Sequence, residues 1–287
     1  MNILVTGANG FIGRNLCVFL SEAGYNDIST ITRENTQEEI LAKVVKADFI
    51  YHLAGVNRPE SDAEFKEGNT DFTSLIVNEL IAFGKKTPIV LTSSTQAELD
   101  NAYGLSKAGA ENLLKVYQDK AGADVFVYRL PNVFGKWCRP NYNSAVATFC
   151  HNTINDLPIT VNNAEAKLNL VYIDDVCKSF IRLLDPTIQK PSTCEVSPVY
   201  KSTVGEVALL LKKFKESRNN LTSERVGTEF IRALYATYVS YFSPEQFAYA
   251  VTRHSDERGT FVEMLKTKDA GQFSFFTAHP GVTRGGH

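Results

Sequence analysis

The stretch 2–13, NILVTGANGFIG, decides the fold. Its first five residues predict a buried strand, and a helical pattern follows over 11–23. Between them stand Gly7, Gly10 and Gly13. In such a loop the first glycine makes a tight turn, the second lets the backbone approach a pyrophosphate, and the third allows close packing of the helix, whose N-terminus attracts the phosphate. This order predicts a dinucleotide site, and the alternative is an ordinary glycine-rich turn.

Outward from this loop, the first half of the chain alternates apolar runs with amphipathic ones. Strands buried on both faces are predicted at 2–6, 28–32, 48–53, 88–92 and 125–130, and helices at 11–23, 36–46, 71–83 and 103–118. This alternation favours an α/β fold with a Rossmann-type, doubly wound parallel sheet. Further helices are predicted at 174–184, 203–215 and 228–239, in a less regular region that we expect to form a smaller substrate-binding lobe.

The predicted domain boundary lies at Ser243 and Pro244, where the pattern of apolar and polar residues changes from helical spacing to alternation. Residues 1–243 are interpreted as the cofactor and substrate domain. In 244–287 the run RGTFVE, residues 258–263, alternates in the manner of a half-buried strand. We therefore expect 244–287 to be the opening strands of a separate, truncated β domain; an irregular C-terminal extension is the alternative.

Composition excludes several classes of protein. The 287 residues are 44% hydrophobic and 22% charged, as in ordinary globular chains. A net charge of -2 gives no electrostatic case for a nucleic-acid partner. No apolar run approaches the ~20 residues of a membrane helix, and the N-terminus resembles a strand rather than a signal peptide. Five scattered cysteines favour reduced thiols over a disulfide frame, so we expect a cytoplasmic enzyme.

The end of the second strand bears on which dinucleotide is bound. An NAD site usually has an acidic residue there, which accepts hydrogen bonds from the ribose hydroxyls. This chain has Thr32 and Arg33 instead. A guanidinium cannot accept those bonds but pairs with a 2′-phosphate, so Arg33 favours NADPH unless it is simply a surface residue.

Tyr103 and Lys107 stand four residues apart on one face of a predicted helix. A tyrosine is a poor acid–base group at neutral pH unless a cation stabilises its phenolate, and Lys107 is placed to do this. The spacing alone also occurs on exposed helices. It gains weight from Ser93 and Ser94 at the end of the fourth strand, because strand ends form the active-site edge of such sheets.

Together these features resemble the extended short-chain dehydrogenase/reductase family. The resemblance rests on TGANGFIG at 6–13, Asp48 with HLAG at 52–55, TSS at 92–94, the Tyr103/Lys107 pair, RLPNVFG at 129–135 and VYIDDV at 171–176, in family order. It implies that Tyr103 is the proton donor or acceptor and that Lys107 assists it while holding the ribose. Ser94 would polarise the substrate carbonyl, with Ser93 as the alternative for that role.

The resemblance also implies the binding residues and the oligomer. The cofactor would contact Gly7, Asn9, Gly10, Phe11, Ile12, Gly13, Arg33, Leu53, Ala54, Gly55 and Lys107. Ser93 and Asn132 are candidates for contact with the nucleotide-sugar substrate, and Asn69 matches a family asparagine that we interpret as structural. A homodimer through 71–83 and 103–118 is expected.

Family members act on nucleotide sugars as dehydratases, epimerases or reductases. Dehydratases carry an Asp–Glu pair after the catalytic serine or threonine, whereas this chain has Thr95 and Gln96. Epimerases usually hold NAD with an acidic second-strand residue, which is missing here. NADPH-dependent reduction of a 4-keto sugar nucleotide is therefore the predicted reaction. The resemblance of the whole chain to capsular polysaccharide enzymes, described next, implies that this substrate is a UDP-4-keto-6-deoxy-HexNAc. The rivals are an epimerase or dehydratase with retained cofactor, and an NADP-binding regulator without activity.

The tail resembles the opening of sugar-nucleotide epimerases built on the cupin barrel. In that family an arginine and a glutamate at the spacing of Arg258 and Glu263 contact the substrate, and a glycine-rich motif leads to a first metal-binding histidine, here His287. A complete cupin would bind zinc and epimerise C3; a site needs at least three protein ligands, so we do not expect this chain to hold the metal. Reductase followed by cupin is the order of bifunctional capsular polysaccharide enzymes.

Overall fold

The computed structural model describes residues 1–191 and 193–283, and the chain divides into two compact units. The first contains Met1–Ser144 and Asn169–Lys201, and the second contains Ala145–Leu168 with the chain from Ser202 onward. The predicted domain boundary falls inside the second unit, where Ser243 caps the short 3₁₀ helix η4 (Pro244–Gln246), and it stays a prediction.

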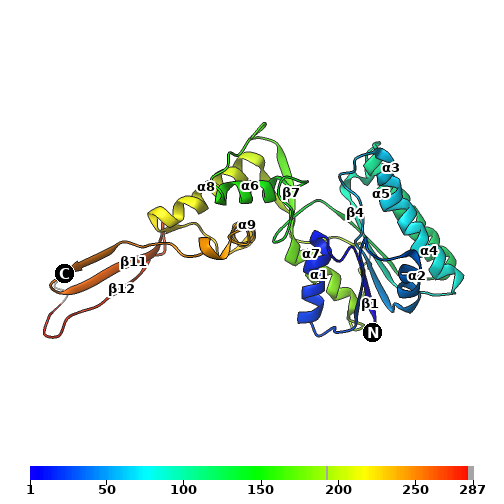
Figure 1. Cartoon of the computed structure of the whole chain (residues 1–287), viewed down its shortest axis with the longest axis horizontal. Coiled ribbons are helices and arrows are strands. Elements are labelled where there is room, and N and C mark those ends of the chain that lie inside the picture. The colour runs from blue at the N-terminus through cyan, green and yellow to red at the C-terminus, as the bar shows by residue number, and fades with distance from the viewer. Residues whose placement is uncertain (192, 284–287) are drawn as a thin grey trace. The chain divides into compact units, whose positions relative to one another are not determined.

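A five-stranded sheet forms the centre of the first unit, in the order β2-β1-β3-β4-β5 with all strands parallel (Figure 1). The strands are β1 (Ile3–Thr6), β2 (Ile28–Ile31), β3 (Phe49–His52), β4 (Ile89–Ser94) and β5 (Val125–Leu130). The order reverses at β1, which is the signature of a doubly wound sheet. The predicted Rossmann-type fold is confirmed.

The prediction that all five strands are buried on both faces is wrong for the two edge strands. Three of the four residues of β2 are only half-buried. Strand β5 alternates, with Phe126, Tyr128 and Leu130 buried and Arg129 exposed. An edge strand has a neighbour on one side only and incomplete helix cover, so only its inner face must be apolar.

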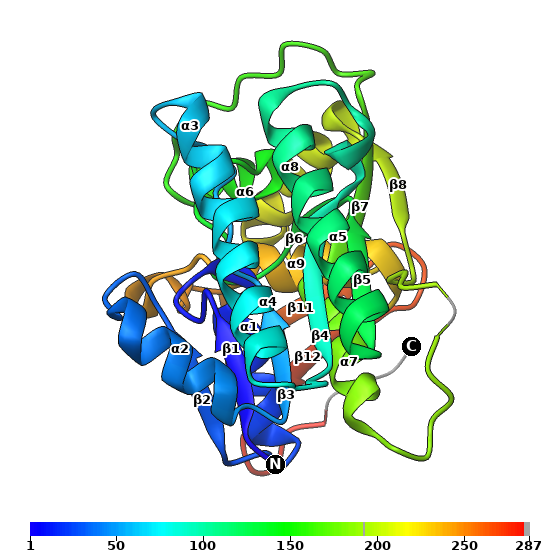
Figure 2. The ribbon, with the colours of Figure 1, turned by 90° about the vertical axis from the view of Figure 1, so that its right-hand side faces the viewer.

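Helices cover both faces of the sheet. Helices α1 (Phe11–Glu22) and α7 (Ile173–Ile181) pack on one face, around an aromatic cluster that includes Tyr51 and Phe180. Helices α2 (Gln37–Lys46), α4 (Phe72–Ala82) and α5 (Ala102–Ala121) pack on the other. Figure 2 shows α4 and α5 running side by side in front of the sheet.

The remaining elements before Val204, apart from the helix Ala145–Ile154, are smaller. They are α3 (Asp62–Phe65), the π-helical segment η1 (Lys66–Asp71) that leads into α4, the 3₁₀ helices η2 (Thr95–Glu98) and η3 (Arg182–Leu184), and a second sheet in the order β6-β7-β8. Its strands are β6 (Asn132–Phe134), β7 (Lys167–Tyr172) and β8 (Tyr200–Thr203). Sequence analysis predicted neither the π-helical segment nor this sheet.

The second unit combines three helices with antiparallel strands. The helices are α6 (Ala145–Ile154), α8 (Val204–Asn220) and α9 (Glu229–Val239), and Thr203 and Glu206 form a capping box at the start of α8. The strands are β10 (Arg253–Asp256), β11 (Gly259–Thr267) and β12 (Gln272–Phe276), and the short β9 (Thr222–Ser223) joins β11. The strands predicted after residue 244 are therefore present. In the described part of the chain, no helix combines the length and apolar character that a membrane span needs.

Candidate active site

The glycine loop after β1 fits a bound pyrophosphate. Gly7 has a φ of +68°, and a Cβ there would lie 2.8 Å from the backbone of Ala54. A Cβ on Gly13 would lie 2.3 Å from the carbonyl oxygen of Gly7, so the first turn of α1 rests directly on the loop. Gly10 is the N-cap residue and supplies no side-chain cap, which leaves the first N–H groups of α1 for an anion. Asn9, Phe11 and Ile12 share this loop and turn.

The predicted adenosine-side residues follow β3, next to this loop. Leu53 and Ala54 donate their backbone N–H groups to Thr6 Oγ1, at 3.1 and 3.0 Å. Both acceptor positions of the Thr6 hydroxyl are then used, so its proton is donated to His52 Nδ1, at 2.9 Å. The end of β1 and the segment after β3 are thus joined through one buried hydroxyl.

His52 continues this hydrogen-bonded chain toward α4. Its Nε2 lies 2.9 Å from Thr73 Oγ1, and Thr73 donates its own proton to the carbonyl oxygen of Asn69 at 2.6 Å. Thr73 must therefore accept from His52, which carries its proton on Nε2. Burial lowers the pKa of His52 to about 3, with the charge of Lys107 adding to the effect, so the imidazole is neutral.

Helix α5 carries Tyr103 and Lys107 one turn apart, as predicted. Asn101 caps the helix by accepting from the backbone N–H of Gly104 at 2.8 Å. A Cβ on Gly104 would lie 2.3 Å from a carbonyl oxygen of the segment between η2 and α5, so the helix start packs tightly against that segment. Lys107 Nζ lies 5.9 Å from the centroid of the Tyr103 ring and donates to the carbonyl oxygen of Thr92 at 3.1 Å.

The two serines at the end of β4 have different partners. Ser94 hydrogen bonds with Tyr103, and its Oγ also accepts from the backbone N–H of Gln96 at 3.1 Å. Ser93 is 5% exposed and donates to the carboxylate of Glu111 on α5. Successive side chains of a strand point to opposite faces, which separates the two hydroxyls. The structure brings Ser94 rather than Ser93 to Tyr103.

Burial shifts the pKa of Tyr103 and that of Lys107 in opposite directions. It raises the pKa of the Tyr103 phenol, against the hydrogen bond with Ser94. It lowers the pKa of Lys107 to about 8, and the carboxylate of Glu111 opposes this shift. At neutral pH both groups hold their protons. The phenol can therefore give up a proton, and the ammonium group stabilises the phenolate that remains.

Asn69 and Gly55 bring the ribose side of the site close to Lys107. A Cβ on Gly55 would lie 2.7 Å from Asn69 Oδ1 and 3.0 Å from Lys107 Nζ. The Asn69 amide donates to the carbonyl oxygen of Val56 and to Ser106 Oγ, each at 3.0 Å. Asn69 thus acts as a structural link between the segment after β3 and α5, as the sequence indicated.

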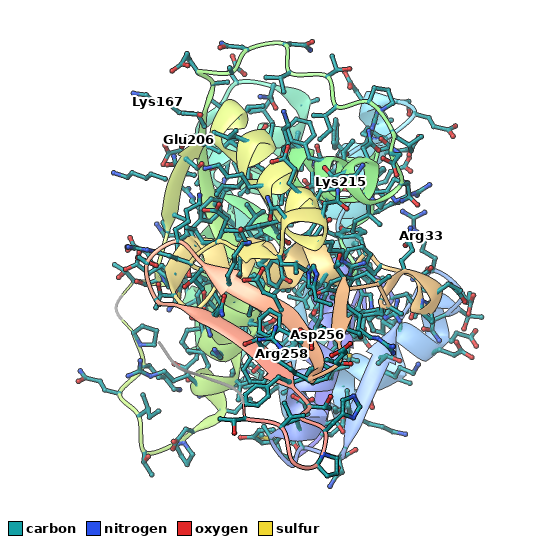
Figure 3. All side chains as sticks on the ribbon, turned by 90° about the vertical axis from the view of Figure 1, so that its left-hand side faces the viewer. Arg33, Lys167, Glu206, Lys215, Asp256 and Arg258 are labelled. Atoms are coloured by element: carbon teal, nitrogen blue, oxygen red, sulfur yellow. The ribbon has the colours of Figure 1, made fainter. Side chains whose placement is uncertain are left out.

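Arg33 lies directly after β2, in a turn shaped by the hydrogen bond from the Thr32 backbone N–H to Asn35 Oδ1 at 2.9 Å. It is exposed and has no hydrogen bond or ion pair with any described residue (Figure 3). A guanidinium at this place can pair with a phosphate group.

Comparison with known proteins agrees with this geometry. Residues 3–196 match the NAD dependent epimerase/dehydratase family, and residues 254–287 match the polysaccharide biosynthesis C-terminal domain. The chain belongs to the NAD dependent epimerase/dehydratase family. It is therefore an enzyme, as its sequence predicted, and the resemblance drawn from its motifs is confirmed.

Relatives within and around this family are similar over most of the chain. The UDP-2-acetamido-2,6-beta-L-arabino-hexul-4-ose reductase of Pseudomonas aeruginosa is 54% identical over 287 residues, which are 100% of this chain and 77% of that protein. The capsular polysaccharide assembling protein CapF of Staphylococcus aureus is 43% identical with a TM-score of 0.91, over 99% of this chain and 78% of that one. The UDP-glucuronic acid 4-epimerase of Bacillus cereus, solved with NAD, has a TM-score of 0.64 at 20% identity over 74% and 83% of the two chains, which shows the shared fold alone.

The predicted substrate residues are spread over both units of this family member. Asn132 is exposed at the start of β6, in the first unit with Tyr103 and Lys107. Arg258 lies in the turn between β10 and β11, where its Nη2 donates to Asp256 Oδ2 at 2.6 Å (Figure 3). Glu263 lies on β11, also in the second unit. Contact of these side chains with a substrate stays a prediction.

The predicted metal ligand, His287, lies outside the described residues. Within residues 1–191 and 193–283, no group of three or more His, Cys, Asp or Glu side chains could hold a metal ion. Among the five cysteines, Cys150 and Cys177 are buried, and Cys17, Cys138 and Cys194 are half-buried.

Sequence reasoning missed Glu111. It stands one turn after Lys107 on α5, and its carboxylate accepts from Ser93 and from Arg129. The signal that could have found it is the repeated four-residue spacing of Tyr103, Lys107 and Glu111, which places all three on one helix face.

Proposed function

We propose that the chain is an NADPH-dependent nucleotide-sugar 4-ketoreductase. It reduces the C4 ketone of a UDP-4-keto-6-deoxy-HexNAc, in the synthesis of an N-acetyl-L-fucosamine precursor for capsular polysaccharide. The identity to the Pseudomonas aeruginosa reductase and the likeness to CapF support this substrate class. The observation that carries the reaction is the Ser94–Tyr103 hydrogen bond beside Lys107, at the end of β4.

Ser94, Tyr103 and Lys107 have different roles in the proposed reduction. NADPH, when bound, supplies the hydride that adds to the ketone carbon. Ser94 donates a hydrogen bond to the ketone oxygen as negative charge develops on it. Tyr103 then transfers its proton to that oxygen, and Lys107 stabilises the phenolate. A buried tyrosine whose pKa is raised is protonated at neutral pH, which suits a proton donor and hence the reductive direction.

Other reactions of the family have less support. Residues Thr95 and Gln96, in η2 directly after Ser94, offer no carboxylate to remove water, so dehydration is disfavoured. An epimerase that retains its cofactor is the second candidate, because the family description names epimerases. Mass analysis of the purified protein separates the two, since such an epimerase carries NAD(P) through purification and a reductase that exchanges its cofactor does not.

The proposal extends to the C-terminal region. The match of 254–287 to a polysaccharide biosynthesis C-terminal domain supports a role of this region in the same biosynthesis. The activity proposed for a cupin domain formed from this region is C3 epimerisation of the sugar. Arg258 and Glu263 would contact the sugar there. Reduction and epimerisation are separable, because the first requires Tyr103 and the second does not.

The direct test mixes the chain with NADPH and a UDP-4-keto-6-deoxy-HexNAc and follows the loss of reduced-nicotinamide absorbance, with NADH in parallel. Faster oxidation of NADPH supports the proposal. No oxidation of either cofactor, with the original ketone and with its C3 epimer, overturns it. Oxidation of the C3 epimer alone means that epimerisation must precede reduction.

Tyr103→Phe tests the proton donor. Because the phenol proton is transferred in the reaction, the variant should lose about 100- to 10,000-fold in kcat. NADPH affinity, measured by fluorescence titration, should change little because the ring remains. Near wild-type turnover would refute the role of Tyr103.

A further inference from the structure

Glu111 joins three elements around the catalytic pair. Its carboxylate accepts a hydrogen bond from the Ser93 hydroxyl on β4. It also accepts two from Arg129 on β5, whose Nε and Nη2 donate at 3.0 and 2.6 Å. Arg129 also pairs with Glu98 of η2 at 2.8 Å. The side chain of Glu111 is only 14% exposed, against 72% for Glu98. A fork of charge-assisted bonds to a shielded carboxylate holds its geometry more firmly than an exposed pair does.

The position of this carboxylate matters because of what lies on either side of it. One turn earlier on α5 stands Lys107, and one residue after Ser93 stands Ser94. The Ser93–Glu111 hydrogen bond therefore links the two elements that carry the reacting groups, directly beside those groups.

We infer that Glu111 is a positioning residue for the proposed reduction: its carboxylate fastens α5 to Ser93, and so fixes the catalytic helix against the end of β4. The inference rests on the proposed function, since it concerns the residues to which that function assigns the proton transfer. It also gives Ser93 a place in the site without contact to substrate.

The carboxylate has an electrostatic effect as well. The titratable groups that act on Lys107 or lie beside it are Tyr103 and Glu111 on α5 and His52 on β3. His52 is neutral, and Tyr103 is protonated until it reacts, so Glu111 is the negative charge that offsets the burial of the ammonium group. Removing it should lower the pKa of Lys107 further below about 8.

The decisive experiment compares Glu111→Gln with Glu98→Gln. Both remove one carboxylate from Arg129, but only Glu111 also touches Ser93. The titration of Lys107 is followed by carbon-13 NMR of protein labelled at lysine Cε, with Lys107→Met for assignment, and the pH profile of kcat is measured alongside. Glu111→Gln should move the Lys107 midpoint, and the loss of kcat at high pH, about one unit lower. Glu98→Gln should move neither. Unchanged midpoints in Glu111→Gln overturn the inference.

Ser93→Ala tests whether the hydrogen bond between Glu111 and β4 positions α5. It also replaces the first experiment if the Glu111→Gln protein does not fold. It keeps both charges and removes only the hydrogen bond to β4. Turnover should fall several-fold, while the KM of the keto sugar and the Lys107 titration stay at wild-type values. Wild-type turnover, or a rise in the KM of the sugar alone, overturns the inference. Because the titration needs no substrate, failure of the wild type to reduce the ketone is recognised separately as failure of the proposed function.

Discussion

His52 is the central residue of the hydrogen-bonded chain that joins the glycine loop after β1 to helix α5. It bonds to Thr6 at the end of β1 on one side and to Thr73 of α4 on the other. Thr73 in turn bonds to Asn69, whose amide reaches Ser106 beside Lys107. Each donated proton in this buried chain has its own acceptor, so the arrangement specifies a single geometry.

The pH dependence of stability reports on His52. In the unfolded chain a histidine binds a proton below about pH 6.5, whereas the buried His52 stays neutral down to about pH 3. Between those values the unfolded state holds the extra proton. The free energy of unfolding therefore decreases as the pH is lowered, by up to about 1.4 kcal/mol per pH unit from this group.

Replacing this side chain should remove that contribution. His52→Asn should be less stable at pH 7.5 by about 1–3 kcal/mol, because it leaves a buried hydroxyl without its partner. Its deficit relative to wild type should shrink as pH is lowered to 5 in urea unfolding experiments. His254→Asn, at an exposed position, is the control for the substitution itself and should be as stable as wild type at pH 7.5. A deficit for His52→Asn that is constant with pH would contradict the neutral, buried state.

Arg33→Ser tests the choice of cofactor. A hydrogen-bonded pair between a guanidinium and a phosphate contributes about 1.5–3 kcal/mol, so the KM of NADPH should rise about 10- to 150-fold. The KM of NADH, which has no 2′-phosphate, should stay within about twofold and provides the internal control. Equal changes for both cofactors would place Arg33 away from the ribose.

At the scale of elements, the alternating strands and helices of the first 130 residues were predictable because each carries its own pattern. Strand β5 and helix α1 begin where the sequence predicted. The elements that were missed are short or lack such a pattern. Strand β6 has three residues, and the π-helical segment η1 reads KEGNTD, which no periodicity identifies. Helix α6 is an exception, because its six buried residues recur at helical spacing, and it packs against α8 and α9.

The residues of the candidate site also divide into those that a local sequence pattern predicts and those that only the fold reveals. The Tyr103/Lys107 pair follows from helical spacing, and the glycine loop from its place between strand and helix. The choice between Ser93 and Ser94 depends on which face of β4 each side chain occupies. Because a buried strand has apolar residues on both faces, the sequence pattern does not show which face points to α5. The Thr6–His52 bond joins residues 46 apart, which no local pattern encodes.

Gly104→Ala tests the junction at the start of α5. A Cβ there would meet two carbonyl oxygens, of Leu99 at 2.3 Å and Gln96 at 2.4 Å, so the helix start must move away from η2. Because Tyr103 precedes Gly104, kcat should fall at least about tenfold while NADPH binding, which uses the loop after β1, is kept. Gly227→Ala, where a Cβ meets nothing within 4 Å, is the control and should retain wild-type turnover. Loss of NADPH binding in Gly104→Ala would mean that the damage is general.

At the scale of the whole molecule, the chain passes between its two units after Ser144, Leu168 and Lys201. None of these crossings coincides with the change of texture at residue 243. A unit formed from two separate stretches of chain leaves no compositional boundary, because each stretch completes a core to which the other contributes. The boundary predicted at residue 243 therefore marks a change in residue pattern, whereas the compact units reflect which parts of the chain pack together in the fold.

The predicted homodimer has a defined surface to test. Helices α4 and α5 lie side by side on one layer of the first unit, and α5 exposes Leu105 and Val116, at 59% and 42% (Figure 2). A two-fold interface brings the same face of both copies together, so a charge placed on it meets its own copy in a desolvated setting. Val116→Lys should therefore convert a wild-type dimer to monomer in size-exclusion chromatography with light scattering. Leu209→Lys, at an apolar side chain of α8 that is 53% exposed in the other unit, should leave the dimer intact. A dimer that survives Val116→Lys but dissociates with Leu209→Lys would move the interface to the second unit, and a monomeric wild type would show that the helix pair is not an interface.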